Sequence, residues 1–132
     1  MVMTQTLEQR IERARRLRAQ GFTCSQCVVM VFDDVHGLDP ATAARVSVGL
    51  GRGIGGCRQA CGTVTGMAIT AGLASYATPA DNQRVLSDIH GMADEFVSIN
   101  GSMVCSELLK PGRKPCMDLI IDSITILHNR LQ

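Results

Sequence analysis

The sequence of 132 residues predicts an all-α fold, a single compact domain of about six or seven helices with a glycine-rich loop before a central small-residue helix. Three observations support this prediction. Helix caps recur along the chain, apolar residues follow them at helical spacing, and aromatic residues, which often pair across strands, make up only 3%. The length suits one domain over residues 1–132, and no linker or repeat divides it.

The first third of the chain predicts three capped helices. Residues 6–9, Thr-Leu-Glu-Gln, have the spacing of a capping box and predict a helix that Gly21 ends. Residues 23–26, Thr-Cys-Ser-Gln, form a second capping box and predict a helix that continues to Gly37. Asp39-Pro40 predicts a third helix, because an N-cap aspartate precedes a proline at the first helical position.

The middle of the chain is rich in glycine. Residues 49–56 contain five glycines and predict a loop, after which a helix is expected over residues 57–76. Gly62 and Gly66 lie one turn apart on this helix, and the lack of a side chain at both positions predicts a close approach by a neighbouring backbone.

The last third predicts three more helices. Thr78-Pro79 starts one that reaches about Ile99. Ser102 is expected to cap a short helix that ends at Leu109. Pro115 opens the final helix, whose apolar stripe faces the core.

Composition and charge exclude several functions. The net charge is +1 and aromatic residues are few, so neither nucleic acid nor an anionic membrane surface is an expected partner. Residues 59–80 carry no charge, but their threonines, serines and glycines favour a buried helix over a membrane span. The N-terminus has no signal-peptide pattern, which predicts a cytoplasmic protein whose six cysteines are reduced.

The cysteines gather at predicted helix starts. A helix N-terminus presents free backbone N–H groups and a partial positive charge, which stabilise the reactive thiolate form of cysteine. A lone cysteine is often only a small core residue. Here five of the six are expected in the opening turn of a helix: Cys24, Cys27, Cys57, Cys105 and Cys116. The sixth, Cys61, is expected one turn after Cys57 on the same helix.

The spacing of the cysteines favours redox chemistry. Cys24 and Cys27 form a Cys-x-x-Cys motif, in which one thiol attacks a disulfide and the other resolves it. No histidine follows Cys27, which excludes covalent attachment of haem c at this motif. Four cysteines from different helices would instead suit zinc or an iron–sulfur cluster, so both interpretations stay open.

Other motifs carry less weight. Residues 51–56 fit Gly-x-Gly-x-x-Gly, but no alternation of strands and helices follows, which argues against dinucleotide binding. The loop still offers backbone N–H groups beside Arg52 and Arg58 for an anion, or room for a partner's disulfide. The three histidines, the acidic pair Asp33-Asp34 and the basic face of residues 10–18 are predicted as solvated surface.

Three runs and one cysteine resemble a known family when taken together. They are Phe22-Thr23-Cys24-Ser25-Gln26, Cys61-Gly62-Thr63-Val64-Thr65-Gly66, residues 102–109 (Ser-Met-Val-Cys-Ser-Glu-Leu-Leu) and Cys116. In this order they resemble the redox-active C_GCAxxG_C_C family, over about residues 10–130. The resemblance implies an all-helical fold, similar to a domain of split-Soret-type cytochromes, and it matches Cys24, Cys61, Cys105 and Cys116. The literal Gly-Cys-Ala is absent, and Cys27 and Cys57 are additional to the four-cysteine pattern.

Three hypotheses follow. In the first, Cys24 attacks a disulfide, Cys27 or Cys61 resolves the mixed disulfide, and Cys105 and Cys116 form a second pair. Cys57 is a further redox candidate. The partner in this hypothesis is a redox protein or a small thiol, and electron transfer is the related activity. In the second, Cys24, Cys61, Cys105 and Cys116 bind zinc or an iron–sulfur cluster. In the third, the chain is a non-enzymatic helical interaction module with packed cysteines.

Overall fold

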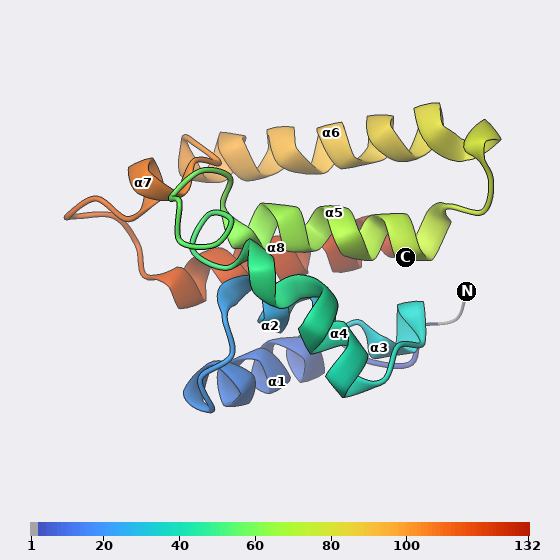
Figure 1. The fold of residues 1–132 in the computed structure, drawn as a ribbon, viewed down its shortest axis with the longest axis horizontal. Helices are drawn as coiled ribbons and strands as arrows, with labels where there is room; N and C mark the ends of the chain where they lie inside the picture. Colours follow the sequence, from blue (N-terminus) through green and yellow to red (C-terminus); the bar gives the residue numbers. More distant parts are fainter. Residues whose placement is uncertain (1–2) are drawn as a thin grey trace.

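The computed structural model describes residues 3–132, and over these residues the predicted all-α fold is confirmed (Figure 1). No strand forms in this range, and the one β-bridge joins Ala60 to Val104. The elements are α1 (Leu7–Ala19), α2 (Cys24–Met30), α3 (Asp33–His36), α4 (Pro40–Ser47), η1 (Val48–Leu50), α5 (Gly62–Ser75), η2 (Pro79–Asp81), α6 (Asn82–Asn100), α7 (Cys105–Leu108) and α8 (Cys116–Leu131).

The two predicted capping boxes start α1 and α2. The Thr6 hydroxyl accepts from the Gln9 backbone N–H, and the Gln9 side chain accepts from the Thr6 backbone in return. Thr23 and Gln26 make the same reciprocal pair before α2. Both pairs satisfy N–H groups that have no partner inside the helix.

The predicted helix over residues 24–37 is wrong in one respect, because it breaks at Val31 and Phe32 into α2 and α3. The Val31 carbonyl accepts a 2.6 Å hydrogen bond from the Arg10 guanidinium of α1. Phe32 is fully buried beneath the same guanidinium, whose Cζ atom lies 4.2 Å from the centroid of the Phe32 ring. A tertiary contact therefore interrupts a helix that local sequence favours, and Gly37 ends α3 in the left-handed conformation as expected.

The helix predicted to begin at Cys57 begins instead at Gly62. Residues 58–61 are held in extended pairing with the segment before α7: Cys61 N–H donates to Met103 O at 2.7 Å, and Cys105 N–H donates to Gln59 O at 2.6 Å. Arg58 adopts a positive φ of 61°, which no helix allows. Pairing with a segment more than forty residues later removes the first turn of the expected helix.

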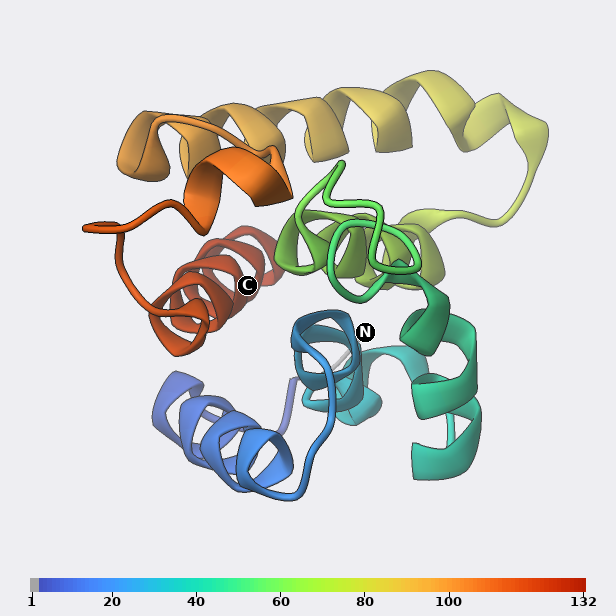
Figure 2. The ribbon, with the colours of Figure 1, turned by 60° about the vertical axis from the view of Figure 1, so that its left-hand side comes forward.

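The predicted close approach at the two glycines of α5 is confirmed. A Cβ atom on Gly66 would lie 3.1 Å from Val28 Cβ and 3.2 Å from Ser25 O. A Cβ atom on Gly62 would lie 2.6 Å from Cys24 Sγ. The absence of side chains thus lets α2 pack directly on α5 at the centre of the molecule (Figure 2).

The C-terminal half follows the prediction with two changes. Thr78-Pro79 opens the short η2 turn, and α6 begins after it and ends at Gly101 in the left-handed conformation. Ser102 does not cap a helix as predicted: its hydroxyl accepts from Val104 N–H, and α7 begins at Cys105. Pro115 directly precedes α8, as expected.

The helices pack so that several of their N-termini meet at one end. α6 covers α5, α8 lies beside α5, and α2 fills the space between them and α1 (Figures 1 and 2). The core comes from all five, with Val28, Met67, Phe96 and Ile124 among its buried members. α2, α5, α7 and α8 all begin at the end that carries the glycine loop. In residues 3–132 we find no helix with the length and hydropathy needed to cross a membrane.

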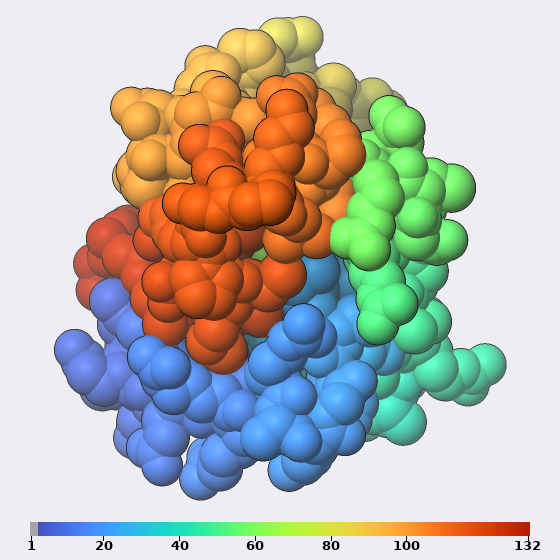
Figure 3. Space-filling model, turned by 90° about the vertical axis from the view of Figure 1, so that its left-hand side faces the viewer, coloured from blue at the N-terminus to red at the C-terminus, as the bar shows by residue number. Residues whose placement is uncertain are grey.

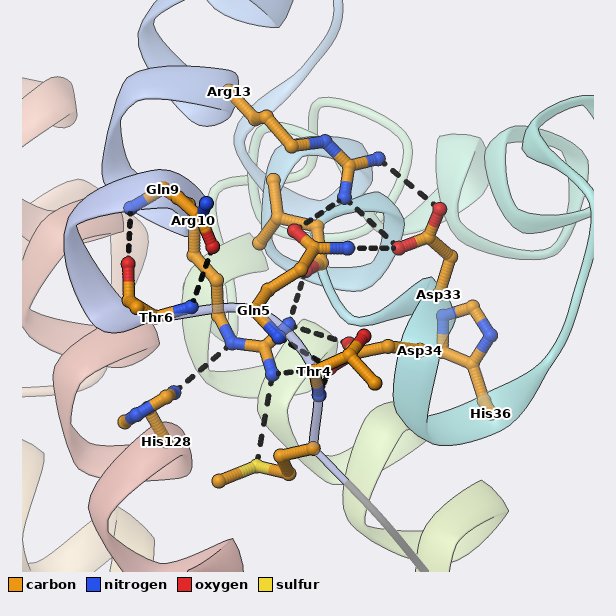
Figure 4. A network of polar contacts seen from close by, with 12 residues as sticks. Thr4, Gln5, Thr6, Gln9, Arg10, Arg13, Asp33, Asp34, His36 and His128 are labelled. Atoms are coloured by element: carbon orange, nitrogen blue, oxygen red, sulfur yellow. Dashed lines mark hydrogen bonds and ion pairs between the residues drawn. The ribbon is translucent and has the colours of Figure 1, made fainter.

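Arg10 of the basic face, the side chain of Asp34 and His128 are buried, which corrects the prediction that these residues lie on the solvated surface. Arg10 is fully buried and forms two hydrogen bonds with the Asp34 carboxylate, at 2.7 and 2.9 Å (Figure 4). Its Nε donates to Nδ1 of the buried His128 at 3.0 Å. Arg13 pairs with Asp33 in a more exposed position, at 2.9 Å. This network joins α1, α3 and α8.

Candidate functional site: a pocket of four cysteines

One pocket brings together Cys24, Cys61, Cys105 and Cys116. Its volume is about 380 Å³, and it opens at the end of the molecule where the helix N-termini meet. Figure 3 shows this face, with a hollow where the segment around residue 20, the glycine loop and the segment from α7 into α8 converge. Leu108, Leu109 and Leu119 supply apolar lining.

Each of the four cysteines lies at the start of a helix. Cys24, Cys105 and Cys116 are the first residues of α2, α7 and α8, as the sequence predicts. Cys61 is the N-cap of α5 and not a residue of its second turn, because α5 starts later than expected. The helix starts therefore determine which cysteines meet, although they are spread over more than ninety residues of sequence.

Cys24 and Cys61 are neighbours in the pocket. The Cys24 sulfur fills the space where a side chain on Gly62, the residue that follows Cys61, would lie. The Cys61 sulfur is within 3.0 Å of the Thr63 hydroxyl, in the first turn of α5. Cys24 and Cys116 are partly exposed, whereas Cys61 and Cys105 are buried. An entering molecule would meet Cys24 and Cys116 first.

Burial counteracts the helix N-termini at two of these thiols. Burial raises the pKa of Cys61, although hydrogen bonds with the Thr63 side chain and backbone oppose the shift. Burial also raises the pKa of Cys116, with a further increase from the nearby negative charge of Cys24 and an opposing effect of Arg18. The expectation that a helix start favours the thiolate is thus not met at Cys61 and Cys116, because desolvation outweighs it.

Cys27 and Cys57 lie outside the pocket. Cys27 is fully buried in the hydrophobic core, and burial raises its pKa to about 11. Cys57 is exposed on the glycine loop and does not start a helix, which corrects the prediction for this residue. All six cysteines are free in this structure, and the redox roles of Cys27 and Cys57 stay predictions.

We expect iodoacetamide at pH 7.5 to label Cys57 first and Cys27 last. Alkylation needs an accessible thiolate, and a thiol with a pKa of about 11 is ionised in only about one molecule in three thousand at this pH. Peptide mass spectrometry over a time course gives the order. If Cys27 in the folded protein were labelled as fast as Cys57, the placement of Cys27 in the hydrophobic core would be contradicted.

Three arginines accompany the cysteines: Arg18 at the end of α1, and Arg52 and Arg58 on the glycine loop. The sequence predicts Arg18 on the solvated face of the first helix and gives no separate signal for Leu119. The signal for Leu108 and Leu109 was their place in the family-like run of residues 102–109. Nothing in the sequence alone indicates that Arg18 faces the cysteines.

Backbone hydrogen bonds within the glycine loop hold Arg52 and Arg58 in a fixed frame. Its backbone N–H groups are mostly used within the loop, for example from Arg58 to Arg52 O at 3.0 Å and from Gly55 to Gly49 O at 2.8 Å. The backbone anion site considered from the sequence is therefore largely occupied by the loop itself. The Gly-x-Gly-x-x-Gly run follows the short η1 turn and not a strand, so it is no dinucleotide-binding motif.

The thiolates of the pocket are of the ligand type that suits zinc or an iron–sulfur cluster. In the described residues, no three side chains of the His, Cys, Asp and Glu types are arranged to hold one metal ion. The reduced four-cysteine pocket is thus open in this structure and not closed around a common centre. Metal or cluster binding by Cys24, Cys61, Cys105 and Cys116 stays a prediction.

Comparison with known proteins agrees with the grouping of the cysteines. A family profile described as "Putative redox-active protein (C_GCAxxG_C_C)" matches residues 22–130, a range that holds all four pocket cysteines. No curated protein and no solved structure matches the chain. The match covers most of the 132 residues, and the chain therefore belongs to the C_GCAxxG_C_C family.

Proposed function

We propose that this protein carries out thiol–disulfide exchange, with Cys24 as the attacking thiol and Cys61 as the resolving thiol. The observation that carries the proposal is the position of the Cys24 sulfur, which fills the space beside Gly62, the residue next to Cys61, in a pocket of four cysteines. The family description as redox-active supports it. A reducing compartment, by expectation the cytoplasm, suits free thiols of this kind.

The proposed reaction transfers two electrons from the protein to a disulfide. The Cys24 thiolate attacks one sulfur of the substrate, forms a mixed disulfide and releases the first substrate thiol. Cys61 then loses its proton to solvent or to the departing thiolate, attacks the Cys24 sulfur and releases the second thiol. The products are a Cys24–Cys61 disulfide and two substrate thiols, and an external dithiol returns the protein to the reduced state.

The pKa of Cys61 suits the second step. Burial raises this pKa, and a negative charge on Cys24, when its thiol is ionised, raises it further. Once Cys24 is in a mixed disulfide, that charge is gone, so the pKa of Cys61 falls and its thiolate forms more readily. Cys24 attacks first because it is partly exposed and the substrate reaches it first, and the buried Cys61 resolves the mixed disulfide afterwards.

Cys105 and Cys116 form the proposed second pair. They are the first residues of α7 and α8, and both line the same pocket. This pair would pass electrons to a Cys24–Cys61 disulfide by the same exchange chemistry.

In a Cys57→Ser background, which removes the exposed thiol outside the pocket, replacing Cys24 with serine is expected to abolish formation of the mixed disulfide. Reduced protein is mixed with an excess of bis(2-hydroxyethyl) disulfide, and intact mass is followed over time. Cys61→Ser is expected to accumulate a mixed disulfide located on Cys24, because nothing resolves it. Cys57→Ser, which removes an exposed thiol outside the pocket, is the matched control and should cycle as the natural sequence does. Unchanged cycling in the Cys24→Ser variant would disprove the assignment.

A further inference from the structure

The pocket carries a strong imbalance of charge. Three arginines line it, Arg18, Arg52 and Arg58, and its lining contains no aspartate or glutamate. The whole chain is nearly neutral, with 13 basic and 12 acidic residues, so this imbalance is local. It surrounds the sulfur atoms to which the proposed function assigns the chemistry.

Two of the arginines have no partner of their own in the described part of the chain. The guanidinium groups of Arg52 and Arg58 make no ion pair and no hydrogen bond with residues 3–132, unlike those of Arg10 and Arg13. Arg18 donates one hydrogen bond, to Phe22 O at 3.0 Å, at the turn before α2. Guanidinium groups bind carboxylates well, because their N–H groups match both carboxylate oxygens.

The backbone at Arg52 and Arg58 has an unfavourable conformation, and hydrogen bonds hold it in place. Both residues have positive φ, 55° and 61°, a backbone conformation that residues other than glycine rarely adopt. Their backbones are joined by the 3.0 Å hydrogen bond from Arg58 N–H to Arg52 O, and Ser106 N–H of α7 donates to Arg58 O at 3.2 Å. This bonding fixes the base of each arginine beside the cysteines, so little order remains to be imposed on the loop when a ligand binds.

The remainder of the lining limits the size and the character of the ligand. The volume of about 380 Å³ is near the lower end for small-molecule sites, and the three leucines offer contact to a short apolar segment. A ligand that fits has an alkyl or peptide-like body, a sulfur at the cysteines and negative charge at the arginines.

We infer that the substrate is a low-molecular-weight disulfide that bears carboxylates, held by Arg52 and Arg58 while its sulfur reaches Cys24. This inference rests on the proposed exchange reaction and adds the substrate class. The carboxylates set the orientation of the disulfide, and Arg18 adds a third positive charge to the lining. The chemistry is the exchange described above, with two carboxylate-bearing thiols as the products.

The test compares three disulfides of similar length and different charge: dithiodipropionate (anionic), bis(2-hydroxyethyl) disulfide (neutral) and cystamine (cationic). The rate constant for the reaction of Cys24 with each, measured in the Cys57→Ser background, is divided by that of free 2-mercaptoethanol, which removes differences in intrinsic reactivity. We expect the normalised rate to be highest for dithiodipropionate and lowest for cystamine. In the Arg52→Gln/Arg58→Gln double variant, we expect the ratio of the anionic to the neutral rate to fall about tenfold. Raised salt should reduce the same ratio.

Arg45→Gln is the matched control, since Arg45 is an exposed arginine on α4 outside the pocket, and this variant should keep the ratio of the natural sequence. Equal normalised rates for the three probes, or a ratio that the double variant leaves unchanged, would overturn the substrate class while the exchange reaction stands. Faster reaction of an uncharged disulfide-bonded peptide than of dithiodipropionate would also overturn it, in favour of a protein substrate. No reaction of Cys24 with any probe would instead disprove the proposed function.

Discussion

Replacing Arg10 with methionine is expected to lower the free energy of unfolding by about 3–5 kcal/mol. The Arg10 side chain is fully buried and the Asp34 side chain is only 6% exposed, so the change leaves a carboxylate without its counter-charge in the interior. It also removes the donors for Val31 O and for Nδ1 of His128. Unpaired buried polar groups are costly because they have lost water and gained nothing in return.

Arg13→Met is the matched control for this variant. Arg13 lies on the same helix and pairs with the neighbouring carboxylate of Asp33, but the two side chains are 27% and 34% exposed. Water can replace the lost partner there, so we expect a loss of no more than about 1 kcal/mol. Urea unfolding followed by far-UV circular dichroism measures both variants. Equal losses in the two would show that burial does not decide the strength of these pairs.

The pH dependence gives a second test of the Arg10 pair. Burial by itself would raise the pKa of Asp34, but hydrogen bonds from Arg10, Thr4 and Gln5 hold it below its ordinary value. A carboxyl group with a lowered pKa contributes stability above its unfolded pKa of about 4 and loses it as the pH falls through the folded value. Without Arg10 the buried carboxyl should take up its proton at higher pH. The difference in stability between the natural sequence and Arg10→Met should therefore narrow as the pH falls from 7 towards 4.

Replacing Gly53 with alanine is expected to cost about 2–5 kcal/mol and to disturb the cysteine pocket. Gly53 has φ of +74°, and a Cβ atom there would lie 2.5 Å from the Gln59 nitrogen and 2.7 Å from Arg58 Cα. These atoms belong to the backbone and cannot turn away as a side chain would. We estimate about 1–2 kcal/mol from the left-handed conformation and about 1–3 kcal/mol from the overlap.

Gly55→Ala separates these two effects. Gly55 also has positive φ, +57°, but a Cβ atom there meets no other atom within 4 Å. We expect Gly55→Ala to cost only the conformational part, about 1–2 kcal/mol. Thermal unfolding and the rate at which Cys24 reacts with bis(2-hydroxyethyl) disulfide measure stability and site geometry. Gly53→Ala should slow the reaction, because Gln59 O bonds to Cys105 N–H and its displacement moves the pocket wall. Equal effects of the two substitutions would contradict the close packing at Gly53.

The sequence by itself predicts most of the helices, because their signals are local. The capping boxes of Thr6 and Thr23, and the prolines at positions 40 and 115, specify four helix starts within a residue or so. Glycines 62 and 66 likewise predict a close helix contact, since only the missing side chain matters there. Two of the four pocket cysteines, Cys24 and Cys116, are placed at helix starts by these same signals.

The tertiary structure decides the features that depend on distant residues. The break between α2 and α3 follows from Arg10 binding the Val31 carbonyl, and the late start of α5 follows from pairing of residues 58–61 with the segment before α7. The second of these makes Cys61 an N-cap and leaves Cys57 exposed on the loop.

The same distinction applies to the candidate site. The sequence shows six cysteines and several arginines, but only packing shows that Cys24, Cys61, Cys105 and Cys116 share one pocket with Arg18, Arg52 and Arg58, and that Cys27 lies in the core. Packing also shows that Arg10 and Asp34 are buried as an ion pair, although a charged residue taken singly is expected on the surface. Hydrogen bonds at helix ends are set by neighbours in sequence, whereas burial and the grouping of side chains depend on how whole helices pack.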